Sequence, residues 1–221
     1  LIIGFVIAGP VIDYMKVEAT KTNVVELHLF NPSDGLRVYM QFAFIVSMVI
    51  TLPFLLFQLW LFISPGLEKD EQKVTLRFIP AVALLFVIGL SFGYFVLFPM
   101  VFSFMNSIAE RLGATIMYGM AEYFGFLFNI VLPLGFLFEL PVVVMFLTRI
   151  RLLNPMKLVK ARRIAYFVLI VIAVTVTPPE IVSDMLVTVP LLILYEFSVF
   201  LSRIVYRKQL AEDATREIMT Q

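Results

Sequence analysis

The sequence has no cysteine and only one histidine, His28, among its 221 residues. Without cysteine the chain forms neither disulfides nor thiolate metal sites. A single histidine cannot supply the pair of imidazoles, one helical turn apart, that many metal sites require. No hydrophobic run contains a histidine, which rules out a Ser–His dyad inside one, and no glycine-rich phosphate loop is present. We therefore expect no enzymatic activity and no cofactor.

Charged residues are also scarce over long stretches. Residues 38–67 and 78–109 contain no Asp, Glu, Lys or Arg. In the whole chain 61% of the residues are hydrophobic, and the mean hydropathy is +0.99. A helix needs about 20 apolar residues to cross the hydrocarbon core of a bilayer, so each run is long enough for one crossing. This pattern predicts an integral membrane protein.

The apolar runs predict an all-α fold, a single domain of six transmembrane helices with a charged tail. We expect the spans at 1–13, 37–64, 77–101, 122–148, 163–177 and 185–202, and the tail at 203–221. Twelve helical residues rise only about 18 Å, so we interpret the first span as the second half of a helix. The fifth and sixth spans are also short. Prolines inside the spans predict kinked helices around a concave face.

Basic residues are divided unevenly between the two sides that six alternating spans define. The loops after the first, third and fifth spans lie on one side and contain four of the seventeen basic residues: Lys16, Lys21, Arg37 and Arg111. The other thirteen lie on the opposite side, in the remaining loops and the tail. The positive-inside rule assigns the side richer in Lys and Arg to the cytoplasm. We therefore expect a multi-pass protein of the cell inner (cytoplasmic) membrane, with its C-terminus in the cytoplasm.

Glu139 is the one charged residue between Tyr123 and Thr148. A charge at that depth costs about 2.5–3.5 kcal/mol on insertion scales unless it is protonated, paired or facing water. Two interpretations stay open. The acid is protonated and capped by a Ser or Thr hydroxyl, or it faces a water-filled concavity and contacts a substrate or a partner helix. Glu196 is a weaker candidate because it lies only six residues from the end of the last span.

The first loop on the cytoplasmic side contains three acids within four positions, Glu68, Asp70 and Glu71. One interpretation is a solvated helical turn whose acids are balanced by Lys69, Lys73 and Arg77. The other is an acidic patch that receives a cationic ligand, because carboxylates accept bidentate hydrogen bonds from guanidinium. The charge pattern alone leaves both open.

Several short motifs follow one another along the chain. They are Asn31-Pro32-Ser33-Asp34, Pro53, Gln58-Leu59-Trp60-Leu61-Phe62-Ile63-Ser64-Pro65-Gly66-Leu67, Glu71, Phe98-Pro99, Phe138-Glu139-Leu140-Pro141, Thr177-Pro178-Pro179-Glu180 and Tyr195-Glu196. Each motif is modest by itself. In this order, and on these spans, they resemble the TatC family, the multi-spanning receptor subunit of the twin-arginine protein translocase.

The resemblance implies a receptor for twin-arginine signal peptides of folded precursor proteins, with export driven by the proton-motive force. It implies signal-peptide-binding residues at the cytoplasmic side, namely Glu71, Lys69, Gln58, Trp60 and Phe62. It also implies self-association in a larger complex embedded in the lipid bilayer, and no nucleic-acid partner.

A second group of polar residues is implied to serve assembly with small single-span translocase subunits. These are Glu139, Glu180, Asp184 and Glu196. Two of them depart from the family pattern, since Glu180 stands where Asp is common and Asp184 where an amide is common.

An alternative hypothesis is a proton- or cation-coupled secondary transporter of a small solute, with Glu139 and Glu196 as ion sites. That class predicts internal repeats with helix breaks at corresponding places in the two halves. The sequence shows no such repeat, which favours the translocase receptor.

Overall fold

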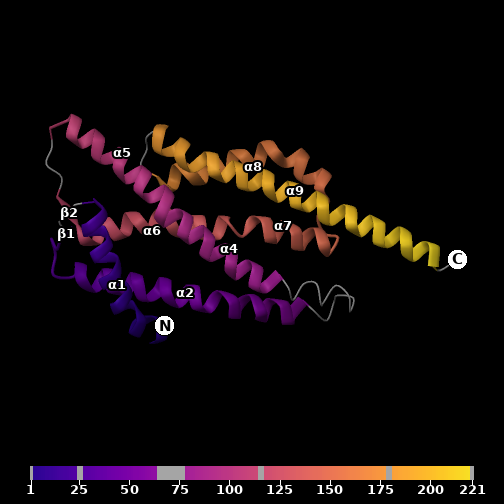
Figure 1. Cartoon of the computed structure of the whole chain (residues 1–221), viewed down its shortest axis with the longest axis horizontal. Coiled ribbons are helices and arrows are strands. Elements are labelled where there is room, and N and C mark those ends of the chain that lie inside the picture. The colour runs from indigo at the N-terminus through magenta and orange to yellow at the C-terminus, as the bar shows by residue number, and fades with distance from the viewer. Residues whose placement is uncertain (1, 24–26, 64–77, 114–116, 178–180, 220–221) are drawn as a thin grey trace.

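The computed structural model describes residues 2–23, 27–63, 78–113, 117–177 and 181–219, nearly all of them helical (Figure 1). The helices are α1 (Ile2–Asn23), α2 (Asp34–Ile63), α4 (Phe78–Phe92), the π-helix η2 (Gly93–Leu97), α5 (Phe98–Arg111), α6 (Met120–Leu137), α7 (Leu140–Arg149), α8 (Pro155–Val176) and α9 (Ile181–Met219). Two short strands, β1 (Leu27–His28) and β2 (Tyr118–Gly119), pair in parallel and tie two loops together.

The helical segments form six rods, because α4, η2 and α5 are continuous and only two residues separate α6 from α7. This confirms the predicted all-α bundle of six helices. Within the described residues, four segments are long and apolar enough to cross a membrane: Asp34–Leu52, Pro80–Arg111, Met120–Arg149 and Ile181–Ala211. The two other rods are α1 and α8, in which charged residues interrupt the apolar run.

The rod of α4, η2 and α5 continues to Arg111, past the expected end at 101, because Pro99 does not end it. Three other helices are longer than the apolar runs that predicted them. α1 continues past Asp13 to Asn23, α8 begins at Pro155 rather than near 163, and α9 reaches Met219 rather than ending near 202. Charged residues end an apolar run but not a helix, since Ala, Glu, Lys and Arg are strong helix formers. The short lengths predicted from the sequence therefore describe the uncharged runs and not the helices.

Pro141 and Pro155 lie in the first turns of α7 and α8, where the missing donor costs nothing. A proline is tolerated there because a first-turn N–H has no acceptor within the helix. The rod α6–α7 is thus divided into two pieces just before Pro141, and Glu139 lies at the junction.

Aromatic side chains hold α2, α5 and α6 together. Phe42 of α2 makes edge-to-face contacts with Phe124 and Phe128 of α6, at centroid distances of 5.0 and 4.8 Å. Phe98 of α5 packs edge-on against Tyr123 of α6 at 5.4 Å. Such pairs contribute about 0.5–1.5 kcal/mol beyond the area that they bury. The aromatic contacts therefore place α6 between α2 and α5.

Glycines let α4 and α6 approach closely. A Cβ added at Gly89 of α4 would lie 2.7 Å from the Cβ of Phe138, and one at Gly135 of α6 would lie 2.8 Å from a leucine methyl of α4. Gly93, one turn after Gly89, lies against the backbone of α6 as well. Small residues one turn apart are common where membrane helices cross at short distance. This crossing brings the α6–α7 junction and Glu139 against α4.

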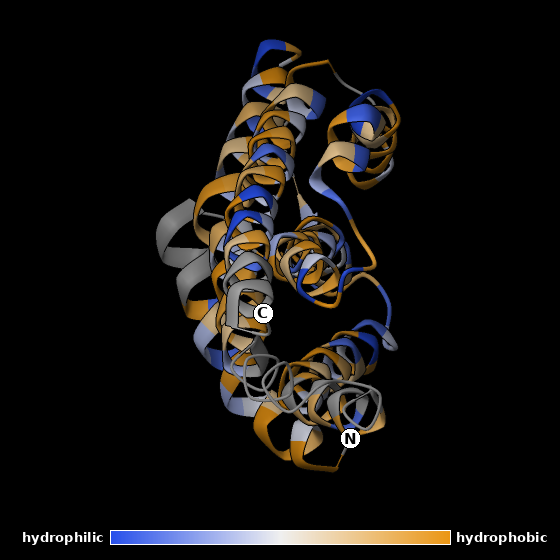
Figure 2. Cartoon of the chain, turned by 90° about the vertical axis from the view of Figure 1, so that its right-hand side faces the viewer, coloured by the Kyte–Doolittle hydropathy of each residue, from blue (hydrophilic) through white to orange (hydrophobic). Residues whose placement is uncertain are grey.

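The outer faces of the helices are largely apolar (Figure 2). Phe54, Phe95 and Phe167, on three different rods, are 62, 67 and 67% exposed. A soluble monomer rarely exposes contiguous apolar surface of this extent, whereas lipid chains are as apolar as the side chains that face them. The surface is that of a protein surrounded by hydrocarbon.

Candidate functional site

Glu139 occupies the break between α6 and α7. The residue is buried, with 9% of its surface exposed, and its carboxylate lies beside the backbone of Phe86 on α4. Neither carboxylate oxygen has a hydrogen-bond partner among the described residues. The interpretation of an acid capped by a Ser or Thr hydroxyl therefore finds no such hydroxyl in the described part of the chain.

Glu196 is held by two residues of α8. Arg162 Nη2 lies 2.7 Å from Glu196 Oε2 in a salt bridge, and the Tyr166 hydroxyl donates to Oε1 at 2.5 Å. The hydroxyl of the neighbouring Tyr195 donates to the Leu158 backbone oxygen at 3.0 Å. Sequence reasoning missed Arg162 because it assigned that residue to the loop before the fifth span. The signal was available, since an acid within a span is expected to have a partner at a similar depth.

Asp184 connects the end of α8 to the start of α9. The Thr177 hydroxyl lies within hydrogen-bond distance of Asp184 Oδ1, at 2.6 Å, and of the Ala173 backbone oxygen, at 2.9 Å. Asp184 is also in the first turn of α9, where a carboxylate interacts favourably with the helix dipole. Glu180, in the turn between the two helices, lies outside the described residues.

The residues expected to bind a signal peptide lie at or beyond the end of α2. Gln58 and Phe62 are in its last two turns with exposed side chains, and Phe62 is 84% exposed. Trp60 belongs to the same helix, but its side chain is outside the described residues, as are Lys69 and Glu71. An exposed glutamine and phenylalanine at a helix end are compatible with ligand contact, and the assignment stays a prediction.

The predicted residues do not converge on one site. The end of α2 and the C-terminal end of α9 lie at the same end of the molecule, whereas the first residues of α9 lie toward the opposite end (Figure 1). The α6–α7 junction lies between these two ends. In the described part of the chain, no group of three His, Asp or Glu residues could hold a metal ion. The polar residues are thus arranged as separate contact points rather than as a catalytic constellation.

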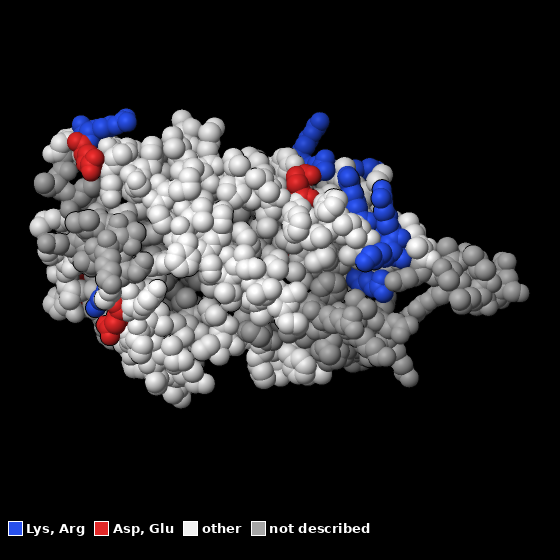
Figure 3. Space-filling model, viewed as in Figure 1, with Lys and Arg blue, Asp and Glu red and all other residues white. Residues whose placement is uncertain are grey.

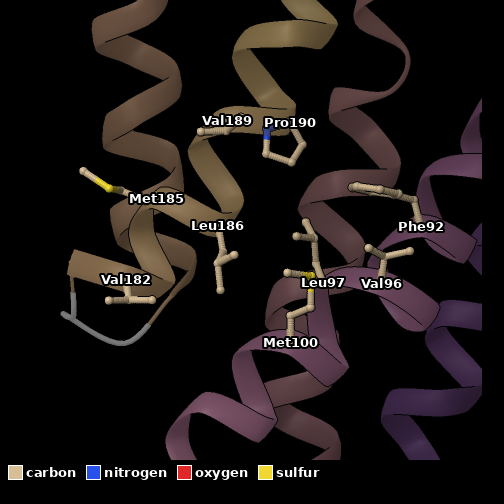
Figure 4. Close-up of a pocket in the computed structure, with 9 residues that line it drawn as sticks. All are labelled: Phe92, Val96, Leu97, Met100, Val182, Met185, Leu186, Val189 and Pro190. Carbon is tan, nitrogen blue, oxygen red and sulfur yellow. The ribbon is translucent and has the colours of Figure 1, made fainter.

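A pocket of about 430 Å³ lies between α9 and the rod formed by α4, η2 and α5 (Figure 4). All nine lining residues are apolar: Phe92, Val96, Leu97, Met100, Val182, Met185, Leu186, Val189 and Pro190. A substrate site normally combines apolar walls with a few polar groups that orient the ligand. This pocket lacks them, so it does not support acid–base chemistry.

The fold and these sites define a helical, multi-pass membrane protein with acids at the α6–α7 break and at the α8–α9 hairpin. The chain belongs to the TatC family, because residues 1–190 match the family model of the Sec-independent protein translocase protein (TatC).

Known proteins of that family are similar over most of the chain. TatCy of Bacillus subtilis (strain 168) is 50% identical over 218 residues, which cover 98% of this chain and 85% of that protein. TatC of Halalkalibacterium halodurans is 49% identical over 208 residues, covering 94% and 82%. The structure is similar to the crystal structure of a twin-arginine translocase receptor, TatC, with a TM-score of 0.80, 28% identity, and coverage of 92% of this chain and 90% of that one. This chain is therefore a subunit of a Sec-independent protein translocase, and the small-solute transporter is not favoured.

Proposed function

We propose that this chain is the receptor that binds twin-arginine signal peptides of folded precursor proteins at the cytoplasmic side of the membrane. The observation that carries the proposal is the similarity to a twin-arginine translocase receptor over 92% of the chain. The ordered motifs of the sequence support it, because they include the acidic loop after α2. In this proposal the C-terminal end of α9 lies in the cytoplasm, and export draws on the proton-motive force without a catalytic step in this subunit.

Recognition of the paired arginines rests on Glu71 in the loop after α2. A carboxylate binds guanidinium through two parallel hydrogen bonds, which a lysine ammonium cannot reproduce. Gln58 and Phe62 present exposed polar and apolar surface at the adjacent helix end, suited to the residues that follow the arginines. Trp60 and Lys69 complete the proposed contact surface.

Small single-span subunits contact the chain at two other places in this proposal. Glu139 is buried, and its oxygens have no partner among the described residues, so a polar group on an incoming helix would stabilise it. Asp184, in the first turn of α9, and Glu180, which precedes that helix in the sequence, form the second contact. Glu196 already has Arg162 and Tyr166 as partners, and we assign it to holding α8 and α9 in place for that contact.

The test is photo-crosslinking of a twin-arginine signal peptide to the full chain in membranes. Glu71→Gln should reduce crosslinking by about tenfold or more, because a charge-assisted bidentate pair contributes about 1.5–3 kcal/mol. Glu68→Gln is the matched control from the same loop and should change crosslinking less than twofold. A peptide with two lysines in place of the arginines should be insensitive to both variants.

Two results would reject the proposal. One is equal crosslinking of the twin-arginine peptide to the Glu71→Gln variant and to the unmodified chain. The other is equal crosslinking of the dilysine and twin-arginine peptides to the unmodified chain.

A further inference from the structure

Exposed basic side chains gather at the end of the molecule from which α9 extends (Figure 3). They come from three segments: the turn after α7, the start of α8 and the later part of α9. We refer to them as the basic end, which comprises Arg151, Lys157, Lys160, Arg163, Arg203, Arg207 and Lys208. Residues 149–163 and 203–211 contain no acid, so like charges accumulate there.

Specific hydrogen bonds hold the three segments together. The hydroxyls of Thr148 and Ser202, both fully buried, lie 2.7 Å apart and join the end of α7 to α9. Gln209, about two turns after Ser202 on α9, donates from Nε2 to the Arg149 backbone oxygen at 2.6 Å. The Arg162–Glu196 salt bridge fixes α8 against the same helix. The basic residues are therefore presented by a rigid arrangement of helix ends rather than by independent loops.

Helical spacing directs part of this charge to one side. Arg203 and Arg207 follow Glu196 at intervals of seven and four residues, so all three lie on one stripe of α9. Glu196 faces α8, because it contacts Arg162 there. In α8 and in α9 from Pro190 to Ala211, Glu196 is the one acid, and it already neutralises Arg162. The next acids of α9, Glu212 and Asp213, follow Lys208 by about one turn. The surrounding bases lie beside a carboxylate whose charge is already paired.

Apolar side chains border the basic end directly. Ile164 and Phe167 of α8 are 70 and 67% exposed, and Phe200 of α9 is 57% exposed. Each lies within a few residues of Arg163 or Arg203. A band of Lys and Arg beside an apolar face is suited to the boundary between lipid headgroups and acyl chains, where long basic side chains extend toward the headgroups.

We propose that the basic end is a binding surface for anionic phospholipid headgroups, with the acyl chains lying along the adjacent apolar faces of α8 and α9. The three segments supply several positive charges, which attract an anionic group. The apolar side chains beside them favour an anion that carries acyl chains, a lipid, over a small soluble anion. Basic pockets between transmembrane helices bind anionic headgroups by this combination of charge and depth. The inference uses only the charge, contacts and exposure of these helices and does not depend on signal-peptide binding.

The test is lipid binding to the purified full chain in a non-ionic detergent, counted by native mass spectrometry. Phosphatidylglycerol and phosphatidylcholine with identical acyl chains are titrated separately. The unmodified chain should prefer phosphatidylglycerol by at least tenfold, and the preference should fall as salt increases. The triple variant Lys157→Gln, Lys160→Gln and Arg163→Gln should lose most of the preference, about fivefold for each charge removed.

The matched control is the double variant Arg37→Gln and Arg111→Gln, which removes two exposed bases far from the basic end in sequence, one in the first turn of α2 and one at the end of α5. It should retain the preference, whereas Arg203→Gln with Arg207→Gln should reduce it. If the triple variant lacks the helical circular dichroism of the unmodified chain, it is misfolded and its lipid binding is not interpreted. The Arg203→Gln and Arg207→Gln double variant then tests whether the basic end binds phosphatidylglycerol.

Three outcomes would overturn the proposal. They are no preference for phosphatidylglycerol in the unmodified chain, an equal loss in the control, and full retention in the variants of the basic end. Competition by inorganic phosphate or by polyglutamate at concentrations comparable to the lipid would identify a small-anion or acidic-peptide site, and would overturn it too.

Discussion

Arg162 of α8 and Glu196 of α9 form a salt bridge in which Nη2 and Oε2 lie 2.7 Å apart. The two side chains are 36 and 38% exposed, so the pair is only partly desolvated. Arg162→Ala leaves the Glu196 charge without its cation and should lower the free energy of unfolding by about 1–3 kcal/mol. Thermal unfolding in detergent measures the change.

A double-mutant cycle with Glu196→Ala separates the pair interaction from the loss of each side chain. The double variant should be destabilised by less than the sum of the two single variants. Lys160→Ala, an exposed base on the same helix, is the control and should change the stability by less than about 0.5 kcal/mol. Strict additivity of the single variants would show that the ion pair contributes nothing.

Glu139 should tolerate neutralisation better than truncation. Glu139→Gln preserves the shape of the side chain and removes the cost of a buried carboxylate, whose oxygens have no partner among the described residues. We expect its melting temperature to equal or exceed that of the unmodified chain, whereas Glu139→Ala should lower it because a cavity forms. A melting temperature several degrees lower for Glu139→Gln would mean that the ionised acid is paired in the membrane.

The same position tests the proposed contact with partner subunits. Glu139→Ala should leave signal-peptide crosslinking within about twofold of the unmodified chain, because the proposed peptide site lies at the end of α2. Co-purification of small single-span subunits, or export of a folded reporter, should fall clearly. Normal assembly and export would remove Glu139 from the contact surface.

The crossing of α4 and α6 should be sensitive to a single methyl group. A Cβ at Gly89 would lie 2.7 Å from the Cβ of Phe138, so Gly89→Ala forces the helices apart and should cost about 1–3 kcal/mol of stability. Gly125→Ala is the control, since a Cβ there meets nothing within 4 Å. It should be neutral or stabilising by up to about 1 kcal/mol, because alanine is the better helix former. Equal unfolding temperatures for the two variants would contradict the close crossing.

The Thr177–Asp184 hydrogen bond should depend more on the acceptor than on the charge of Asp184. Asp184→Asn keeps an oxygen in reach of the Thr177 hydroxyl, which lies 2.6 Å from Oδ1, so the unfolding free energy should change by less than about 0.5 kcal/mol. Asp184→Ala removes the acceptor and should cost about 1 kcal/mol. Equal losses in the two variants, measured by thermal unfolding, would show that the charge matters instead.

The sequence predicted the number of helices and the positions of the most apolar ones. The rod α6–α7, Met120–Arg149, nearly coincides with the expected span at 122–148, and α2 begins within three residues of its expected start. These spans could be predicted from the sequence because a membrane helix must be apolar on every face that contacts lipid. The end of α9 at Met219 could not be predicted from hydropathy, since helix formation outside the bilayer depends on helix propensity and on contacts.

Candidate residues were visible for the same reason, but their partners were not. Glu139 and Glu196 were conspicuous as single acids in apolar runs. In the structure Glu139 has no hydrogen-bond partner among the described residues, whereas Glu196 is paired with Arg162. Nothing in the local sequence around the two acids predicts this difference. That difference depends on residues 34 positions apart, brought together by the α8–α9 hairpin.

The sequence by itself determined that this chain lies in a membrane, that it forms six helical rods, and that its motifs are those of the TatC family, because hydropathy and ordered motifs are properties of the chain. Only the tertiary structure decided how close the rods approach and which charges are neutralised. The approach of Gly89 to Phe138 and the pairing of Arg162 with Glu196 arise where separate helices pack. Van der Waals contact and electrostatic attraction act over a few ångströms of space, whatever the separation along the chain.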